Sequence, residues 1–456
     1  MINTAIIGGG YAGMAAAVAL AEKGIPVTVF ESARHLGGRA RGVAHQNTQL
    51  DNGQHLLLGC YHQTLRMIEQ VGGNLEQDFL RQPLQLDLHG HFALRAPRLP
   101  APLHLLVALL RAQGLTWAER LSAASFMLTL RRMNFKLPSP TSGESVTRGT
   151  KPVGGEGCDM TATELLARHG QSPALVQKLW EPLCIAALNT PVAIASAQVL
   201  LNVLRDALNQ ERADSDMLIP RIDFTALFPQ RAAHYIEQRG GTVLTSCGAA
   251  SLRPVEQGIE ITTDQGCPES GQRIAMTYSH VICAIPPTTA AKLLRPIPAL
   301  ADVVAQIDAL QHQPIYTVYL QYPSQVRLPH PMLGLHQRIS QWLFDKGQIA
   351  GQYGLIACVI SAEGLHQDWS QNELALKVIA ELHAEFGIND TPLWHKVIAE
   401  KRATFACTPD LRRPDQQTPL PSLLLAGDYT KGDYPATLEG AIQSGLRCAE
   451  LLSSSF

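Results

Sequence analysis

The chain of 456 residues lacks the patterns that mark several common classes of protein. It contains no Gly-x-Ser-x-Gly motif, which excludes the nucleophile turn of an α/β-hydrolase. No Cys-x-x-Cys pair or other metal-ligand spacing occurs, and we find no internal repeat or low-complexity tract. The formal net charge is −2, so the composition gives no overall attraction for nucleic acid. With 46% hydrophobic and 17% charged residues, the chain is long enough and apolar enough for two or more cores.

Signals for secretion are also missing. The nine cysteines are scattered between Cys60 and Cys448, and their odd number argues against a disulfide framework and for a reducing compartment. The N-terminal stretch has no basic region and no cleavage site. We therefore expect buried, reduced cysteines in a cytoplasmic protein.

What the sequence does contain is a glycine-rich unit near its N-terminus. The apolar run Ala5 to Ile7 leads into Gly8-Gly9-Gly10-Tyr11-Ala12-Gly13, an alanine-rich helix pattern follows, and a second apolar run ends at Glu31. A βαβ unit of this length with an acid after its second strand is typical of dinucleotide binding. Gly8 permits the tight turn, and Gly13 lets the helix pack on the strand. Gly10 lets the backbone approach a pyrophosphate, and Glu31 accepts hydrogen bonds from ribose hydroxyls.

A second glycine-rich stretch, Leu36-Gly37-Gly38-Arg39-Ala40-Arg41, follows directly. The bare backbone at Gly38 and the planar cation of Arg39 suit a phosphate group. With this stretch the sequence resembles the superfamily of flavin-containing amine oxidases and phytoene desaturases. The resemblance implies FAD as the cofactor. It also implies an α/β fold in which a Rossmann-type FAD-binding domain is interleaved with an α+β substrate domain.

The resemblance extends to the C-terminal end of the chain. A buried strand pattern stops at Gly427-Asp428, and a helix pattern begins near Glu439. In the superfamily the Gly-Asp pair meets the pyrophosphate and ribityl region of FAD, and the helix points its N-terminus at the flavin ring. The resemblance therefore implies that Gly427, Asp428 and the backbone near Glu439 and Ala441 contact FAD. It also implies that the strand near Ala249 passes the adenine.

Four further stretches are similar to one branch, the squalene-associated FAD-dependent desaturases, which include hydroxysqualene dehydroxylases. These stretches are residues 50–55, 180–191, 216–223 and 427–435, whereas Pro138 to Gly157 departs from the branch and looks like a loop insertion. The resemblance implies reductive dehydroxylation of hydroxysqualene to squalene in hopanoid and squalene biosynthesis. An oxidative, phytoene-type carotenoid desaturase stays open as an alternative. A non-catalytic scaffold for prenyl synthases also stays open, although complete FAD motifs at both ends of the chain argue against it.

The chemistry of dehydroxylation needs a proton donor, because hydroxide is a poor leaving group. His55 is the first candidate, since the segment Asn52-Gly53-Gln54-His55 passes the flavin ring in related flavoproteins. By the same resemblance Gly53 and Gln54 touch the ring. A histidine after a turn can also simply bond to backbone, so other residues of the branch stretches remain alternatives: Asp216, Arg221, Tyr429 and Asp433.

Residues 99–135 are apolar and basic together. The cations of this region face a single acid, Glu119, and they are Arg95, Arg98, Arg111, Arg120, Arg131, Arg132 and Lys136. The run Leu103 to Leu110 is too short to cross a bilayer. The pattern favours either a buried helix or a helix that lies on the inner membrane, and both interpretations stay open.

The order of expected elements divides the chain into two interleaved domains. Residues 1–80, 215–290 and 405–456 are expected to form the FAD-binding domain. Residues 81–214 and 291–404 are expected to form the substrate domain, with a polyprenoid lipid as substrate and squalene or prenyl synthases as partners. Periodicity predicts helices at 64–71 and 224–239 and strands at 258–263, 314–322 and 355–361. Thr161 or Thr163 is predicted to cap a helix that ends near His169.

Overall fold

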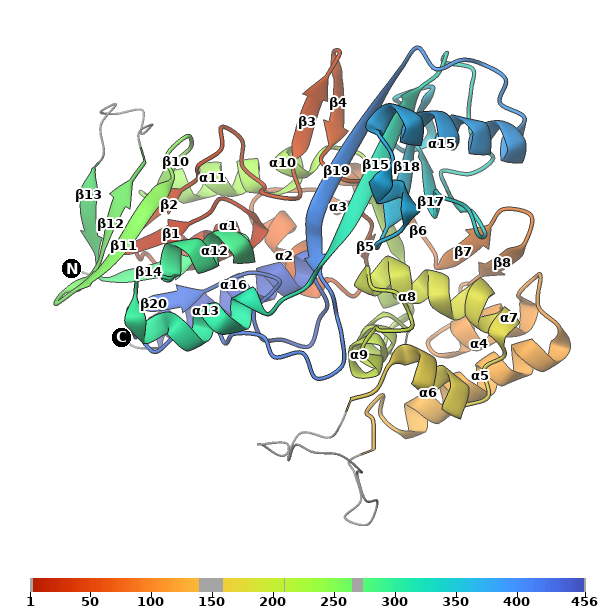
Figure 1. Ribbon diagram of the computed structural model, residues 1–456, viewed down its shortest axis with the longest axis horizontal. Coiled ribbons are helices and arrows are strands. Elements are labelled where there is room, and N and C mark those ends of the chain that lie inside the picture. The colour runs from red at the N-terminus through yellow and green to blue at the C-terminus, as the bar shows by residue number, and fades with distance from the viewer. Residues whose placement is uncertain (1–2, 139–158, 209, 265–273, 455–456) are drawn as a thin grey trace.

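The computed structural model describes residues 3–138, 159–208, 210–264 and 274–454. Residues 139–157 of the expected loop insertion lie outside these ranges. Figure 1 shows a parallel sheet wrapped by helices on the left, a larger sheet at the upper right, and a group of helices below it. The site described below lies where these three parts meet.

The parallel sheet has five strands in the order β10-β2-β1-β14-β20. The strands are β1 (Thr4–Ile7), β2 (Val27–Phe30), β10 (Thr242–Leu244), β14 (His280–Cys283) and β20 (Leu423–Leu425). They come from three separate stretches of chain, and every neighbouring pair is parallel. Helices α1 (Tyr11–Glu22) and α16 (Leu438–Ser453) pack against each other beside this sheet. All four residues of β1 are buried, as expected for a strand with both faces covered.

Smaller antiparallel units flank the parallel sheet. Strands β11 (Ala249–Val255), β12 (Gly258–Thr263) and β13 (Ala275–Tyr278) form a sheet at its edge (Figure 1), and β12 confirms the strand predicted at 258–263. Strands β3 (Gly42–His45) and β4 (Thr48–Asp51) form a hairpin. A third unit has the order β5-β9-β6, made of Leu57–Leu58, Met217–Pro220 and Phe79–Gln82.

The larger sheet has seven strands in the order β19-β15-β18-β17-β16-β7-β8. Its strands are β7 (Gln85–Leu88), β8 (Phe92–Arg95), β15 (His312–Gln321), β16 (Met332–Gly334), β17 (Trp342–Asp345), β18 (Leu355–Ser361) and β19 (Trp394–Phe405). Strands β15 and β18 confirm the two strands predicted here. Because side chains alternate along a strand, Leu343 and Cys358 join the core beneath α15 (Gln371–Phe386), whereas Trp342, Phe344 and Val359 face the other way.

The group of helices runs from α4 to α9. Its members are α4 (Leu103–Arg111), α5 (Trp117–Arg132), α6 (Ala162–Arg168), α7 (Pro173–Leu175), the π-helical turn η1 (Val176–Trp180), α8 (Glu181–Leu188) and α9 (Ala197–Leu208). Thr161 caps α6, as one of the two predicted alternatives: its hydroxyl accepts the Glu164 N–H, and the Glu164 carboxylate accepts the Thr161 N–H. Within the described ranges, no helix combines the length and apolar character that crossing a bilayer requires.

The remaining helices connect these parts. They are α2 (His62–Gln70), α3 (Leu75–Asp78), η2 (Arg212–Ser215), α10 (Phe224–Leu227), α11 (Pro229–Glu237), α12 (Pro287–Leu294), η3 (Pro298–Leu300), α13 (Ala301–Asp308), α14 (Lys346–Ala350) and η4 (Leu365–Asp368). Helix α2 confirms the helix predicted at 64–71. The single helix predicted at 224–239 is wrong, because the chain breaks at Phe228 into α10 and α11. Pro229 has no N–H to continue the first helix, and it starts the second one.

The cysteines follow the expectation in part. Six of them are buried free thiols: Cys60, Cys184, Cys283, Cys358, Cys407 and Cys448. Cys247 is disulfide-bonded, so the expectation of wholly reduced cysteines is wrong at that position.

Candidate active site

The two glycine-rich stretches lie side by side at the ends of β1 and β2. Gly10 and Gly37 form a parallel bridge. A Cβ added at Gly8, whose φ is +112°, would lie 2.4 Å from the Ala284 carbonyl oxygen, so the protein itself requires glycine there. At Gly10 an added Cβ would meet nothing closer than the Gly38 Cα at 4.0 Å. The bare backbone at Gly10 therefore borders free space, which is what close approach of a pyrophosphate needs.

Gly13 and Glu31 support this turn from two sides. A Cβ at Gly13 would lie 2.0 Å from the Gly8 carbonyl oxygen, so α1 could not pack on the strand with a larger residue. Glu31 follows β2, and its two carboxylate oxygens accept the N–H groups of Gly9 and Ala33, each at 2.7 Å. Oε2 keeps a second lone pair for a further donor, whereas Oε1 also accepts a long hydrogen bond from the Ser32 hydroxyl at 3.4 Å. The acid thus both closes the turn and faces the cavity described below.

An ion pair joins the second glycine stretch to the C-terminal Gly-Asp pair. The Arg39 guanidinium donates to Asp428 Oδ1 at 2.5 Å and to the Ala403 carbonyl at 2.6 Å. These two bonds use only some of the five N–H donors of the guanidinium. Segments almost 390 positions apart in the chain are therefore held at one place, with both charged groups on the wall of the same cavity.

The segment after β4 supplies the candidate acid. His55 Nδ1 lies 2.6 Å from the Gly53 carbonyl oxygen. Because a carbonyl only accepts, Nδ1 carries the proton and Nε2 keeps its lone pair. Burial and, to a smaller extent, the nearby Arg39 lower the pKa of His55 to about 4, although the bond to Gly53 opposes both. The imidazole is neutral at pH 7 and offers an acceptor at Nε2, while its ring packs 4.7 Å from that of Phe224.

A cavity of about 730 Å³ connects these groups to an apolar chamber. Eleven of the residues predicted to bind the cofactor or to act in catalysis line it: Gly8, Gly10, Glu31, Gly38, Arg39, Gly53, Gln54, His55, Gly427, Asp428 and Ala441. The chamber is walled by α8, α9, β9 and the inner face of the seven-stranded sheet, with side chains that include Leu183, Leu204, Met217, Trp342 and Phe344. The predicted polar motifs therefore share one continuous space with an apolar enclosure whose lining residues were not predicted.

Three residues predicted to serve the cofactor lie off this wall: Gly13, Ala249 and Glu439. Gly13 packs α1 on β1, and Ala249 begins β11. The Glu439 side chain is buried and turns away to the start of α2. It accepts the backbone N–H groups of Gln63 and Thr64, at 3.1 and 2.9 Å, and the Thr64 hydroxyl at 2.7 Å. Its carboxylate thus caps α2, while the backbone of α16 remains near the cavity through Ala441.

The alternative candidates for the acid are scattered. Tyr429 lines the cavity, and within the described residues its buried hydroxyl has no hydrogen-bond partner. Asp216 is paired with Arg81 at 2.8 Å and Arg212 at 3.0 Å. Arg221 is exposed. Asp433 borders a different hollow, so Tyr429 alone among these four is placed to meet a ligand in the cavity.

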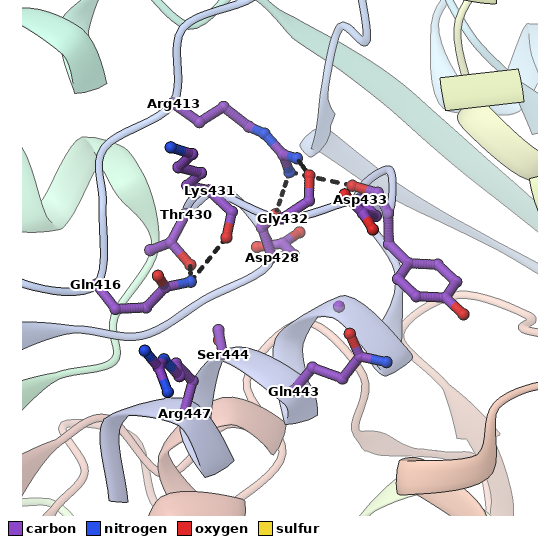
Figure 2. Close-up of a pocket in the computed structure, with 12 residues that line it drawn as sticks. Arg413, Gln416, Asp428, Thr430, Lys431, Gly432, Asp433, Gln443, Ser444 and Arg447 are labelled. Carbon is purple, nitrogen blue, oxygen red and sulfur yellow. Dashed lines mark hydrogen bonds between the residues drawn. The ribbon is translucent and has the colours of Figure 1, made fainter. Parts of the chain in front are cut away.

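The second hollow, of about 270 Å³, lies on the other side of Asp428. Figure 2 shows Arg413 reaching over the loop that carries Asp428 and Gly432. Its guanidinium donates to the carbonyls of Gly432, of Asp428 at 3.3 Å and of Tyr434 at 3.0 Å. Arg413 therefore holds the loop after the Gly-Asp pair in shape.

Asn189 is a residue of the cavity wall that sequence reasoning missed. It ends α8 in the left-handed conformation, with φ of 47°. Its amide donates to Thr404 Oγ1 at 2.9 Å and accepts the Ala362 N–H at 2.7 Å. These bonds tie α8 to the seven-stranded sheet. The stretch 180–191 carries the resemblance to the squalene-associated branch, and an Asn after an apolar helix pattern is in addition a signal for such a cap.

The sequence profile of the family described as "flavin containing amine oxidoreductase" matches residues 11–453. The chain belongs to this family. Membership confirms the predicted fold class, the flavin cofactor FAD and the assignment as an oxidoreductase. The geometry agrees with the cofactor, because bare backbone, the acid that follows β2 and a helix N-terminus border one cavity.

Individual proteins of known name are also similar to this chain. The chain is 27% identical to a hydroxysqualene dehydroxylase of Sinorhizobium fredii over 99% of this chain and 98% of the relative. It is 25% identical to the zeta-carotene desaturase of Solanum lycopersicum over 97% of this chain and 79% of the relative. The structure of a protein described as a putative protoporphyrinogen oxidase from Exiguobacterium covers 100% of this chain and 99% of its own, with a TM-score of 0.70 and 16% identity. That last similarity shows the fold alone.

Proposed function

We propose that this protein is an FAD-dependent oxidoreductase that reduces hydroxysqualene to squalene. The observation that carries the proposal is the continuous cavity, in which the glycine motifs open directly into an apolar chamber. A long hydrocarbon with one hydroxyl suits such a space. Hydrophobic contact is not directional, so apolar walls can bind a hydrocarbon along its whole length. The similarity to a hydroxysqualene dehydroxylase over the full chain supports the same substrate class.

We assign the cofactor to the polar end of this cavity. The residues proposed to contact FAD are Gly8, Gly10, Glu31, Gly38, Arg39, Gly53, Gln54, Gly427, Asp428 and the backbone near Ala441. Gly13 and Glu439 support these contacts by packing and by capping α2. Ala249 at the start of β11 stays a proposed neighbour of the adenine. The division into an FAD-binding domain (1–80, 215–290, 405–456) and a substrate domain (81–214, 291–404) follows from this assignment.

Reduced flavin, when bound, supplies the hydride for an allylic carbon. The chain's own contribution begins with exclusion of water by α8, α9 and the seven-stranded sheet, which strengthens every polar contact at the reacting centre. His55 Nε2 can accept a hydrogen bond from the substrate hydroxyl and so fix its position. To serve as the proton donor, as proposed from the sequence, His55 must first gain a proton, which its low pKa opposes. The Tyr429 hydroxyl, which has no hydrogen-bond partner within the described residues, is a second candidate donor on the wall.

The second candidate function is oxidative desaturation of a carotenoid precursor. The same cavity would hold a linear polyene, and the similarity to a zeta-carotene desaturase favours this alternative over others. The two reactions run the flavin in opposite directions. The two functions can therefore be distinguished by whether the substrate reacts with the reduced or with the oxidised flavin.

We also propose that α4 and α5 rest on the inner membrane, with the remainder of the protein in the cytoplasm. The outer face of α4 is apolar: Leu103 is 51% exposed, and Leu106, Val107 and Leu110 are half-buried. On α5, Trp117, Leu121 and Leu128 share one exposed face. A surface helix normally turns polar residues outward, so this apolar face needs a covering surface.

The charges around the α4–α5 face favour anionic lipid as that surface. Arg111, Arg131 and Arg132 are exposed and make no ion pair within the described residues. The acid of the region, Glu119, is occupied by Thr116 in a capping box. Apolar side chains beside cations of one sign suit anionic headgroups. Squalene or prenyl synthases at the same membrane are the proposed source of substrate.

Turnover tests the proposed function. Purified FAD-loaded protein would be supplied with hydroxysqualene and a chemical reductant, and lipids would be extracted for analysis. We expect squalene in amounts that grow with time and with enzyme concentration. Formation of a more unsaturated product from a carotenoid precursor, with hydroxysqualene untouched, would favour the desaturase instead.

A further inference from the structure

Lys346 is a buried cation behind the wall of the cavity. It is the first residue of α14, directly after β17, and only 5% of its surface is exposed. Its ammonium donates to Gln54 Oε1 at 3.3 Å. Within the described residues it forms no ion pair within 4 Å. Burying a lysine without a contacting carboxylate is costly, so its presence beside a cofactor cavity calls for a functional explanation.

Two acids lie near this lysine without touching it. Asp51 ends β4, is 4% exposed, and its carboxylate accepts the Phe224 N–H at 2.9 Å. Burial raises the pKa of Asp51 to about 6, an effect that Lys346 opposes. Burial lowers the pKa of Lys346, and Asp51 and Asp223 oppose that change. The three groups form a charged cluster: both acids favour the charged form of Lys346, and Lys346 favours the carboxylate of Asp51, whereas Asp223 disfavours it.

The cluster is linked to the cavity through Gln54. Besides accepting from Lys346, the Gln54 side chain donates to the His55 carbonyl at 3.3 Å, and its backbone N–H donates to Thr317 Oγ1 at 3.4 Å. Tyr319, on the same strand β15 as Thr317, donates to the Asp51 carbonyl at 3.0 Å. Side chains of the seven-stranded sheet thus hold the segment that faces the proposed flavin ring, and Lys346 supplies the charged contact.

We propose that Lys346 is a positioning residue that orients the Gln54 amide and favours the reduced form of the cofactor through its buried positive charge. The inference rests on the proposed function, because that assignment places Gly53 and Gln54 against the flavin ring. Reduction of a flavin adds two electrons and, at neutral pH, one proton, which leaves net negative charge. In an apolar, water-poor enclosure such a charge interacts with a nearby cation more strongly than it does in solvent.

The experiment measures the midpoint potential of the bound flavin in full-length protein by equilibration with a reference dye, without substrate. Lys346→Met should shift the potential to more negative values. Asp51→Asn, which removes the neighbouring negative charge and keeps an acceptor for Phe224, should shift it to more positive values. Lys292→Met removes an exposed lysine of α12 and should leave the potential unchanged. A role in packing alone does not predict opposite shifts.

The outcomes separate this inference from the proposed function. Equal potentials in the wild type, Lys346→Met and Asp51→Asn would overturn it, whatever the substrate is. If Lys346→Met does not retain FAD, Asp51→Asn decides alone, and an unchanged potential again overturns it. Opposite shifts in a protein that never converts hydroxysqualene would support the role of Lys346 while rejecting the substrate.

Discussion

Gly10 and Gly13 are three residues apart, yet the structure gives them different tasks. A side chain at Gly10 would project into free space, whereas one at Gly13 would collide with the Gly8 carbonyl at 2.0 Å. Gly10→Val should therefore fold and lose FAD, and Gly13→Val should lose the fold itself. Flavin absorbance after purification and a urea unfolding curve check both. A yellow Gly10→Val protein would contradict the assignment of the pyrophosphate site.

His55 should leave a signature in the pH dependence of stability. Its folded pKa of about 4 lies below its usual value, so between these pH values the unfolded chain binds the proton and the folded protein does not. The contribution of His55 is fully present above about pH 6.5 and is lost as the pH falls through 4. Asp51, with its pKa raised to about 6, acts in the opposite direction over an overlapping range.

Comparison with His55→Gln isolates the histidine from Asp51. As the pH falls from 7 to 4, wild-type stability should drop relative to His55→Gln by about 3 kcal/mol. Urea unfolding at several pH values measures the difference. A difference that stays constant over this range would mean that the imidazole is not buried as described.

At the scale of single elements, Glu439 shows what sequence patterns could not reveal. The resemblance to the flavin superfamily implied a site near the cofactor for this residue, and Ala441 of the same helix turn does line the cavity. The direction of its side chain depends on α2, which is some 375 positions away in the chain and packs on α16. Local periodicity carries no information about such a long-range contact.

Removal of the Glu439 carboxylate should destabilise the protein strongly. Glu439→Ala leaves two backbone N–H groups and one hydroxyl without their buried acceptor, which we expect to cost about 2–4 kcal/mol. Glu450→Ala, on the exposed face of the same helix, should change stability by no more than about 0.5 kcal/mol. Equal unfolding midpoints for the two variants would contradict the capping role.

We predict that the exposed apolar face of α4 and α5 contributes to lipid binding. Trp117 and Leu121 are 67% and 59% exposed, so Trp117→Ser with Leu121→Ser should hardly affect folding. Binding to vesicles that contain anionic lipid should weaken about tenfold. The matched control is Leu365→Ser with Leu376→Ser, which removes equally exposed side chains elsewhere. If both double variants bind vesicles as the wild type does, the face serves another partner.

For the whole molecule, the sequence predicted the parts that depend on local pattern. Spacing and residue type predicted the βαβ unit and the strands β15 and β18, and they limited the cap of α6 to Thr161 or Thr163. The residues that line the apolar chamber were not predicted, because Leu204, Met217 and Phe344 come from three distant segments that meet only in the folded chain. The charged cluster around Lys346 was missed for the same reason, since a lone lysine after an apolar run normally lies in solvent.

The most direct test of the central claim uses a single turnover. Protein loaded with FAD is photoreduced without oxygen and mixed with hydroxysqualene, while the flavin spectrum is followed and the lipid is extracted. We predict reoxidation of the flavin with one squalene formed per flavin. If the flavin stays reduced and the hydroxysqualene is recovered unchanged, reductive dehydroxylation is contradicted. The oxidative desaturase would then be the favoured function.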